Sequence, residues 1–256
     1  MKLRVLGCSG GQVPGHKLSA FLIDDRLLID AGSATEALDL KAQGKIADIL
    51  ITHIHLDHVF SLGTLADNLY GKRAKSINVW SVEAIIDGLK KHFFNDELWP
   101  DFTKIKGPTQ RSTVLKLMCI SSNKPTRVGA YAVTLVHVNH VVASVAFFIE
   151  DKNKTLLHVG DTGPTTEVWS LANSQDNLGA VIIETSFPNR LQDIADASQH
   201  LTPRTLALEL SKLGSRDIPI LVTHLKPQFR AEITRELKRL KDPRLRILQD
   251  GDLLHL

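Results

Sequence analysis

The sequence predicts an α/β fold, because short apolar runs alternate with amphipathic segments that carry helix-capping residues. The runs are rich in Leu, Ile and Val and end in a polar residue followed by a turn, which is typical of buried strands. They cover residues 2–7, 20–25, 26–32, 47–53, 155–161, 180–186 and 218–224. Because such runs occur in both parts of the chain, we expect one domain, residues 1–256, built of two β-rich halves.

Helices are predicted between these strands from their start and stop signals. Ser33 stands three positions before Glu36, which is the spacing of a capping box, and this helix should fade at Gly44. Thr202 followed by Pro203 is a second strong helix start. The predicted helices cover residues 33–44, 82–94 with Ser81 as the cap, 202–214 and about 227–240.

The stretch from about 93 to 128 has no clear pattern and is expected to be an inserted loop or lid. It carries the aromatic residues Phe93, Phe94, Trp99 and Phe102. These rings either pack the insertion against the body of the protein or form a lid that stacks on a substrate. We favour packing.

Composition limits the function classes. The chain of 256 residues is 43% hydrophobic and 23% charged, and its net charge of +3 does not point to a duplex nucleic-acid binder. Two cysteines, Cys8 and Cys119, are too few for a disulfide framework. There is no signal-peptide pattern and no run of the roughly 18–20 apolar residues that a membrane helix needs. We expect a cytoplasmic soluble protein without a membrane partner or a stable nucleic-acid partner.

Several predicted strands end in a His or Asp residue. These residues are Asp30, His53, Asp161 and His224. Sites in α/β sheets form just beyond the carboxyl ends of strands, so the four side chains could converge. The alternative is that each is a polar residue that reaches solvent.

The segment THIHLDH, residues 52–58, indicates a metal site. His53, His55 and Asp57 are two positions apart, so in an extended segment they point the same way, and His58 is adjacent. Imidazole and carboxylate groups bind zinc, manganese or iron, whereas four such groups buried without a metal would be costly to desolvate. A solvated loop is the alternative. Because Asp57 and His58 are adjacent, the four side chains cannot easily serve one ion, and we predict two ions, one on His53 and His55 and the other on Asp57 and His58.

The string H-x-H-x-D-H after a strand resembles the metallo-β-lactamase superfamily of binuclear hydrolases. The form HIHLDH resembles the class II cyclic-nucleotide phosphodiesterases. Further similar segments occur in the same order, namely LGCSGG at 6–11, HVGDTGP at 158–164, ETSFPN at 184–189, HLTP at 200–203 and THLKP at 223–227. This resemblance covers nearly the whole chain, and it implies a four-layer αβ/βα sandwich.

The resemblance also implies the remaining metal ligands. Asp161 would bridge both ions, and His224 would complete the second site. The first site needs a histidine between the two motifs, where His137 and His140 both stand. We prefer His140, because Ser144 and an apolar strand follow it as in the family. The predicted metal ligands are therefore His53, His55, Asp57, His58, His140, Asp161 and His224, and they would hold two divalent ions, zinc first, with manganese or iron as alternatives.

Residues around the ligands have expected roles. By resemblance, His200 and Thr202 bind substrate at a helix N-terminus that attracts anions, and His200 is catalytic as a proton donor, together with Asp57. Without the resemblance, Thr202 is only a helix cap and His200 a loop residue. Asp30 is expected to orient a ligand histidine. Glu184 is either a strand-end carboxylate or an outer partner near the metals.

The resemblance implies hydrolysis of 3′,5′-cyclic nucleotides, cyclic AMP and/or cyclic GMP, to 5′-nucleotides. A metal-bridging hydroxide would attack phosphorus while the ions neutralise charge on the phosphoryl oxygens. Alternatives are a tRNA 3′-processing endonuclease of the ribonuclease Z type, another superfamily hydrolase such as a lactonase or thioesterase, or a non-enzymatic metal-binding protein. No basic or glycine-rich arm for a large polyanion is visible in the sequence. The resemblance also allows a homodimer.

Overall fold

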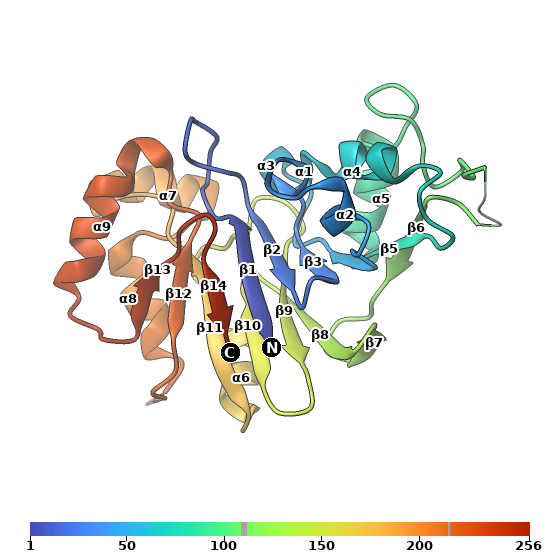
Figure 1. Ribbon diagram of the computed structural model, residues 1–256. Helices are drawn as coiled ribbons and strands as arrows, with labels where there is room; N and C mark the ends of the chain where they lie inside the picture. Colours follow the sequence, from blue (N-terminus) through green and yellow to red (C-terminus); the bar gives the residue numbers. More distant parts are fainter. Residues whose placement is uncertain (109–111, 215) are drawn as a thin grey trace.

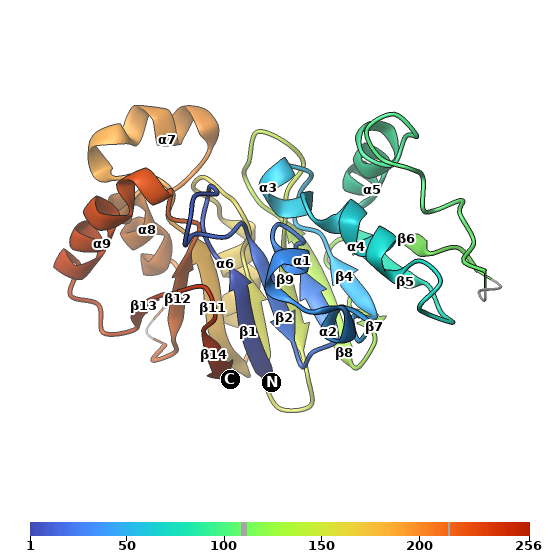
Figure 2. The ribbon, with the colours of Figure 1, turned by 45° about the horizontal axis from the view of Figure 1, so that its top comes forward.

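Two mixed sheets face each other, and helices cover the outer face of each, in a computed structural model that describes residues 1–108, 112–214 and 216–256 (Figure 1). The helices of the N-terminal half lie on one side and most helices of the C-terminal half lie on the other (Figure 2). The predicted α/β class and its four layers are confirmed.

The first sheet has seven strands in the order β14-β1-β2-β3-β4-β5-β6. Strands β3 to β6 run parallel, so their carboxyl ends meet at one edge. The strands are β1 (Lys2–Gly7), β2 (Ala20–Ile23), β3 (Leu27–Ile29), β4 (Asp48–Leu50), β5 (Ile77–Ser81), β6 (Leu115–Cys119) and β14 (Leu253–His255). The helices of this half are α1 (Ala34–Ala37), α2 (Leu40–Gln43), α3 (Leu56–Val59), α4 (Leu62–Leu69) and α5 (Glu83–His92).

The second sheet also has seven strands, in the order β13-β12-β11-β10-β9-β8-β7, and β10 to β13 run parallel. The strands are β7 (Thr126–Val128), β8 (Tyr131–His137), β9 (Val145–Glu150), β10 (Thr155–His158), β11 (Leu178–Glu184), β12 (Ile220–Thr223) and β13 (Leu245–Ile247). The helices are α6 (Glu167–Ser174), α7 (Gln192–Ser198), α8 (Pro203–Ser211) and α9 (Arg230–Arg239), with 3-10 turns η1 (Asn189–Leu191) and η2 (Pro227–Phe229).

Strand β11 shows how the sandwich buries its apolar residues. Its side chains alternate between the two faces of the sheet. Ala180 and Ile182 belong to the core that includes the strands of the first sheet. Val181 and Ile183 pack instead with the apolar faces of α6, α8 and α9. A strand that is buried on both faces has apolar residues at consecutive positions, which is why this strand could be predicted from the amino-acid sequence.

The single helix predicted over residues 33–44 is wrong. The chain forms α1 and α2 instead, separated by Leu38 in an extended conformation. The Ser33 hydroxyl does not cap α1, because it accepts a hydrogen bond of 2.9 Å from the Leu18 backbone N–H. Asp39 caps α2 by accepting from the Ala42 N–H at 2.7 Å. A long-range contact of Ser33 therefore outweighs the local capping pattern.

The helix predicted after Ser81 forms, but Ser81 is not its cap. Its hydroxyl donates to the Ile51 carbonyl at 2.7 Å, and α5 begins after Val82 without a side-chain cap. No helix of the described residues combines the length and the apolar character that a bilayer span requires.

The stretch at about 93–128 is not all loop. It contains β6 and the edge strand β7, which belong to different sheets, while residues 109–111 lie outside the described residues. Phe93, Phe94 and Phe102 are buried in the core of the first half, and Trp99 packs against it. The packing interpretation of these aromatic residues is confirmed, and the lid interpretation is wrong for the three phenylalanines.

Candidate metal centre

The motif THIHLDH lies just after β4, at the carboxyl edge of the first sheet. His53 and His55 lie in the segment between β4 and α3, and His55 is the residue before the first turn of α3. Asp57 and His58 are part of α3, so the prediction that Asp57 continues an extended run is wrong. The helix gives these two side chains a different direction from the one that they would have in an extended run. The four side chains of the motif therefore divide between two groups, His53 with His55 and Asp57 with His58, as the sequence predicted.

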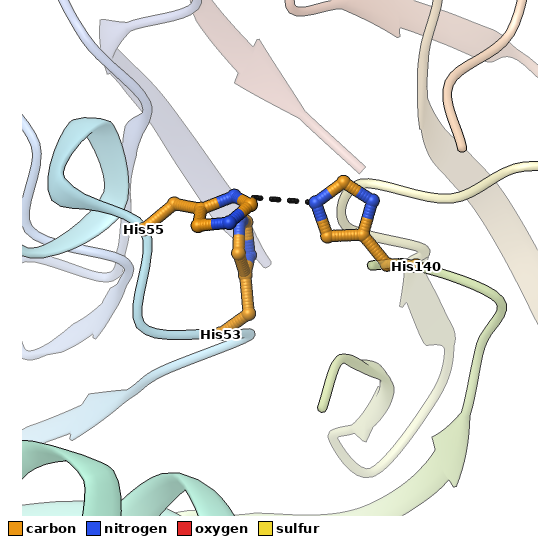
Figure 3. Close-up of side chains that lie close together, drawn as sticks. All are labelled: His53, His55 and His140. Carbon is orange, nitrogen blue, oxygen red and sulfur yellow. Dashed lines mark hydrogen bonds between the residues drawn. The ribbon is translucent and has the colours of Figure 1, made fainter. Parts of the chain in front are cut away.

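The first group consists of His53, His55 and His140, whose ligand nitrogens lie within 4.8 Å of one another (Figure 3). His140 lies in the loop between β8 and β9, and its Nε2 is 3.2 Å from His55 Nδ1. His137 lies outside the group. It is exposed at the end of β8, with Nε2 3.0 Å from the hydroxyl of Ser122.

The second group consists of Asp57, His58, Asp161 and His224, which follow β4, β10 and β12. The Nε2 atoms of His58 and His224 are only 3.3 Å apart. Asp161 Oδ2 lies 3.4 Å from His58 Nε2 and 3.2 Å from His224 Nε2. It is also 3.8 Å from His53 Nε2 of the first group. Asp161 therefore stands where the two groups meet.

Asp30 fixes the ring of His58 from behind. His58 Nδ1 donates to Asp30 Oδ2 at 2.7 Å, which turns Nε2 toward the second group. The backbone N–H and the hydroxyl of Thr52 each donate to the same carboxylate at 2.8 Å. The expected hydrogen bond between Asp30 and a histidine of the motif is confirmed, whereas the part played by Thr52 was missed.

Glu184 organises the opposite side of the centre and acts as an outer partner of the site rather than a mere strand-end carboxylate. Its side chain is buried, and it accepts from His200 Nδ1 at 2.6 Å and from the Ser186 hydroxyl at 2.7 Å. Ser186 Oγ in turn lies 2.9 Å from His224 Nδ1, so a chain of hydrogen bonds orients both histidines. Ser186 was missed, because a lone serine after a strand carries no signal of its own.

Thr202 caps α8 as predicted. Its hydroxyl accepts from the Thr205 N–H at 3.3 Å, and the Thr205 hydroxyl accepts from the Thr202 N–H at 2.8 Å. The expected contact of Thr202 with substrate is not supported, because the residue is fully buried and its hydroxyl also donates to Gln192 at 2.7 Å. Its role is to hold the loop that carries His200.

The charges of the site suit cations. Burial lowers the pKa of His53, and the nearby His58 lowers it further, so its imidazole is neutral, as metal ligands must be. Burial opposes ionisation of Asp57 and Asp161, yet His224 and His58 hold the pKa of both carboxyls below its usual range. Burial also opposes protonation of His58, but the carboxylates of Asp161 and Asp30 outweigh it and raise the pKa of His58. The buried carboxylates thus favour positive charge between the two groups.

The donor set fits two divalent metal ions. His53 Nε2 is buried and has no hydrogen-bond partner among the described residues, although it faces Asp161. An unpaired buried polar atom is costly unless a ligand completes it. Imidazole and carboxylate together are suitable ligands for zinc, manganese and iron.

Two facing sheets with this cluster at their edge define a protein of the metallo-β-lactamase fold. Unliganded yeast PDE1 superimposes with a TM-score of 0.84 at 22% identity, covering 100% of this chain and 99% of that one. YhfI of Bacillus subtilis, a metallo-β-lactamase fold protein, gives 0.79 at 20% identity over 99% and 98% of the two chains. The short form of human tRNase Z gives 0.72 at 15% identity over 100% and 99%. These likenesses concern the fold.

Residues 33–255 match the family model of class-II cAMP phosphodiesterases, and the chain belongs to this family. It is 28% identical to 3′,5′-cyclic-nucleotide phosphodiesterase 1 of Saccharomyces cerevisiae in an alignment that covers 90% of this chain and 72% of the relative. It is also 28% identical to a probable 3′,5′-cyclic-nucleotide phosphodiesterase of Yersinia pestis, with 88% of this chain and 78% of the relative covered.

Proposed function

We propose that the protein is a metal-dependent phosphodiesterase that hydrolyses 3′,5′-cyclic nucleotides to 5′-nucleotides. The observation that carries this proposal is the meeting of two groups of metal-binding side chains at Asp161, in a chain of the class-II cAMP phosphodiesterase family. The named activity of the yeast and Yersinia relatives supports the choice of substrate.

The chain's own side chains divide between two ions, for which zinc is our first choice. His53, His55 and His140 would hold one ion, and Asp57, His58 and His224 the other, with Asp161 shared. When bound, two divalent cations lower the pKa of water and offset the negative charge of a phosphoryl group. The protein contributes a fixed arrangement, because Asp30, Ser186 and Glu184 hold the rings by hydrogen bonds.

His200 is the residue that we assign to protonation of the leaving ribose 3′ oxygen. Its ring stacks on that of His224 with centroids 5.5 Å apart, so it lies against the second group. Glu184 binds Nδ1, which leaves Nε2 as the nitrogen for the substrate. Burial lowers the pKa of His200, but the charge and hydrogen bond of Glu184 outweigh this effect and raise it. A protonated imidazole can donate to the departing oxygen.

The proposed function is tested by assaying four substrates with one preparation. These are cyclic AMP, cyclic GMP, bis(p-nitrophenyl) phosphate and a precursor tRNA. We expect about two metal equivalents per chain by mass spectrometry, turnover of a cyclic nucleotide, loss of that turnover on chelation and recovery with zinc, manganese or iron. Turnover of the tRNA but of neither cyclic nucleotide, or activity that survives complete removal of metal, would contradict the proposal.

The substitution His200→Gln tests the role of the proton donor. We expect kcat for cyclic AMP to fall by about 10²–10⁴-fold, the usual contribution of general acid catalysis. The rate with bis(p-nitrophenyl) phosphate should fall much less, because p-nitrophenolate leaves without protonation. Steady-state kinetics with both substrates, at unchanged metal content, make the comparison. An equal loss with both substrates would assign His200 to the architecture of the centre instead.

We propose a cytoplasmic protein, which agrees with the absence of a disulfide between the free Cys8 and Cys119. A homodimer stays a prediction that light scattering can test. The tRNA endonuclease alternative is supported by likeness of fold alone, to the short form of human tRNase Z and to the long form RNase Z of yeast.

A further inference from the structure

Gln199 lies between the end of helix α7 and His200, and its backbone is in the left-handed conformation, with φ of 52° and ψ of 56°. Such values are uncommon for a residue other than glycine, and they are least favourable for β-branched residues. The Gln199 N–H donates to the Asp196 carbonyl at 3.2 Å. The His200 N–H donates to the Ala195 carbonyl at 2.8 Å. The chain therefore ends α7 at Gln199 and turns there, immediately before His200.

The carbonyl of Gln199 holds a member of the first metal-binding group. His140 Nδ1 donates to this carbonyl at 3.1 Å, so that Nε2 faces the group, 3.2 Å from His55 Nδ1 (Figure 3). The second ring nitrogen of a metal-binding histidine is usually fixed in this way, and loss of its partner weakens metal binding about 10–100-fold. Gln199 therefore acts on His140 as Asp30 acts on His58.

The side chain of Gln199 takes no part in this contact. Its Oε1 is buried and has no hydrogen-bond partner within residues 1–108, 112–214 and 216–256. The backbone, in contrast, is closely packed, because a Cβ atom at Gly163 would lie 3.3 Å from Gln199 Cα. The Gly163 N–H donates to the carbonyl of Asn139, the residue before His140, at 2.6 Å. The path of the backbone at position 199 is therefore what matters, and not the amide group.

His200 is held by a separate set of contacts. Glu184 accepts from His200 Nδ1 at 2.6 Å and from the Leu201 N–H at 3.3 Å. The rings of His200 and His140 lie edge to face, with centroids 5.0 Å apart. Because the carbonyl of residue 199 fixes one of these rings and the next residue carries the other, a change of backbone conformation at Gln199 would displace both.

We propose that Gln199 is a positioning residue, whose left-handed conformation orients the His140 ring for the first ion and places His200 for the substrate. The part that concerns His200 rests on the proposed function. The part that concerns His140 is a statement about metal binding alone.

Substitutions at position 199 test this role through their tolerance of the left-handed conformation. Glycine and asparagine adopt it readily, alanine less so, and valine least. Gln199→Gly and Gln199→Asn should keep both metal affinities close to those of the wild type, although both alter the side chain. Gln199→Val should weaken the binding of one ion about 10–100-fold, and Gln199→Ala should lie between. Titration with a chelator that competes for zinc measures the two affinities.

Lys241→Val is the matched control. Lys241 is exposed, follows α9 and has a φ of 55°, so valine meets the same unfavourable conformation at a position outside the metal-binding groups. This variant should lose Tm as Gln199→Val does but keep both metal affinities. If Gln199→Val does not fold, Gln199→Ala carries the comparison. A loss of affinity in Gln199→Gly as large as in the valine or alanine variant, or no loss in any of them, would overturn the role of Gln199.

A second measurement concerns His200. At saturating metal, Gln199→Val, or Gln199→Ala in its place, should lose more rate with cyclic AMP than with bis(p-nitrophenyl) phosphate, whose leaving group needs no proton. An equal loss with both substrates would overturn the placement of His200 by Gln199. A wild-type protein that turned over neither cyclic nucleotide would overturn the proposed function, whereas the order of metal affinities would still decide the role of Gln199 toward His140.

Discussion

Asp161→Asn is expected to abolish nearly all phosphodiesterase activity. The Asp161 carboxylate lies within 3.8 Å of histidine nitrogens from both groups, and an amide of the same shape lacks its negative charge. We expect kcat/KM for cyclic AMP to fall by about 10³-fold or more, because both ions would lose the ligand that we propose they share, in a centre that depends on their charge. Metal analysis should give fewer than the about two equivalents of the wild type.

Asp176→Asn is the matched control for this experiment. Asp176 is exposed and lies outside the metal-binding groups, so the same change of charge there should leave metal content and rate unaltered. If Asp161→Asn kept both ions and its full rate, Asp161 would not be the shared ligand and the binuclear interpretation would fail.

His140→Ala is expected to remove about one metal equivalent and to lower kcat/KM by about 100-fold or more, since even the outer partners of metal ligands contribute about 10–100-fold. His140 is the member of the first group that comes from the loop between β8 and β9. Without it, the first site would keep only His53, His55 and the shared Asp161, one donor fewer than the four that a tight site usually has. Metal content and cyclic AMP hydrolysis measure the effect.

The neighbouring His137 provides the control for His140. It is exposed and contacts Ser122, so His137→Ala should stay within about twofold of the wild type in rate and metal content, as surface substitutions usually do. The reverse result, in which His137→Ala loses the ion and His140→Ala keeps it, would exchange their roles and contradict the arrangement in the structure.

The candidate metal centre was largely predictable because its side chains stand at the ends of apolar strands. Asp161 and His224 follow β10 and β12, and His53 follows β4. The rule that sites form at the carboxyl ends of strands therefore groups these residues from the amino-acid sequence alone. The choice of His140 over His137 came from the resemblance to a family. Nothing in the local sequence distinguishes the two.

One error arose where a contact distant in sequence outweighed a local pattern, because Ser33 has the spacing of a helix cap but binds the Leu18 N–H. A second error was one of local conformation, because Asp57 alternates with His55 in sequence but lies in a helix. The parts played by Thr52 and Ser186 were not predictable, because a hydroxyl acquires its partner only when segments such as those of Asp30 and His224 meet. Local propensity is a weak guide in such places.

Each half of the sandwich supplies only part of the coordination sphere. The first sheet contributes the motif after β4, while His140, Asp161 and His224 follow strands of the second sheet. Neither half alone therefore has the side chains to bind two ions tightly, and tight binding requires that the two sheets are packed together. Ions that bind only the folded protein stabilise it by mass action, so the free energy of unfolding should increase with the concentration of free metal.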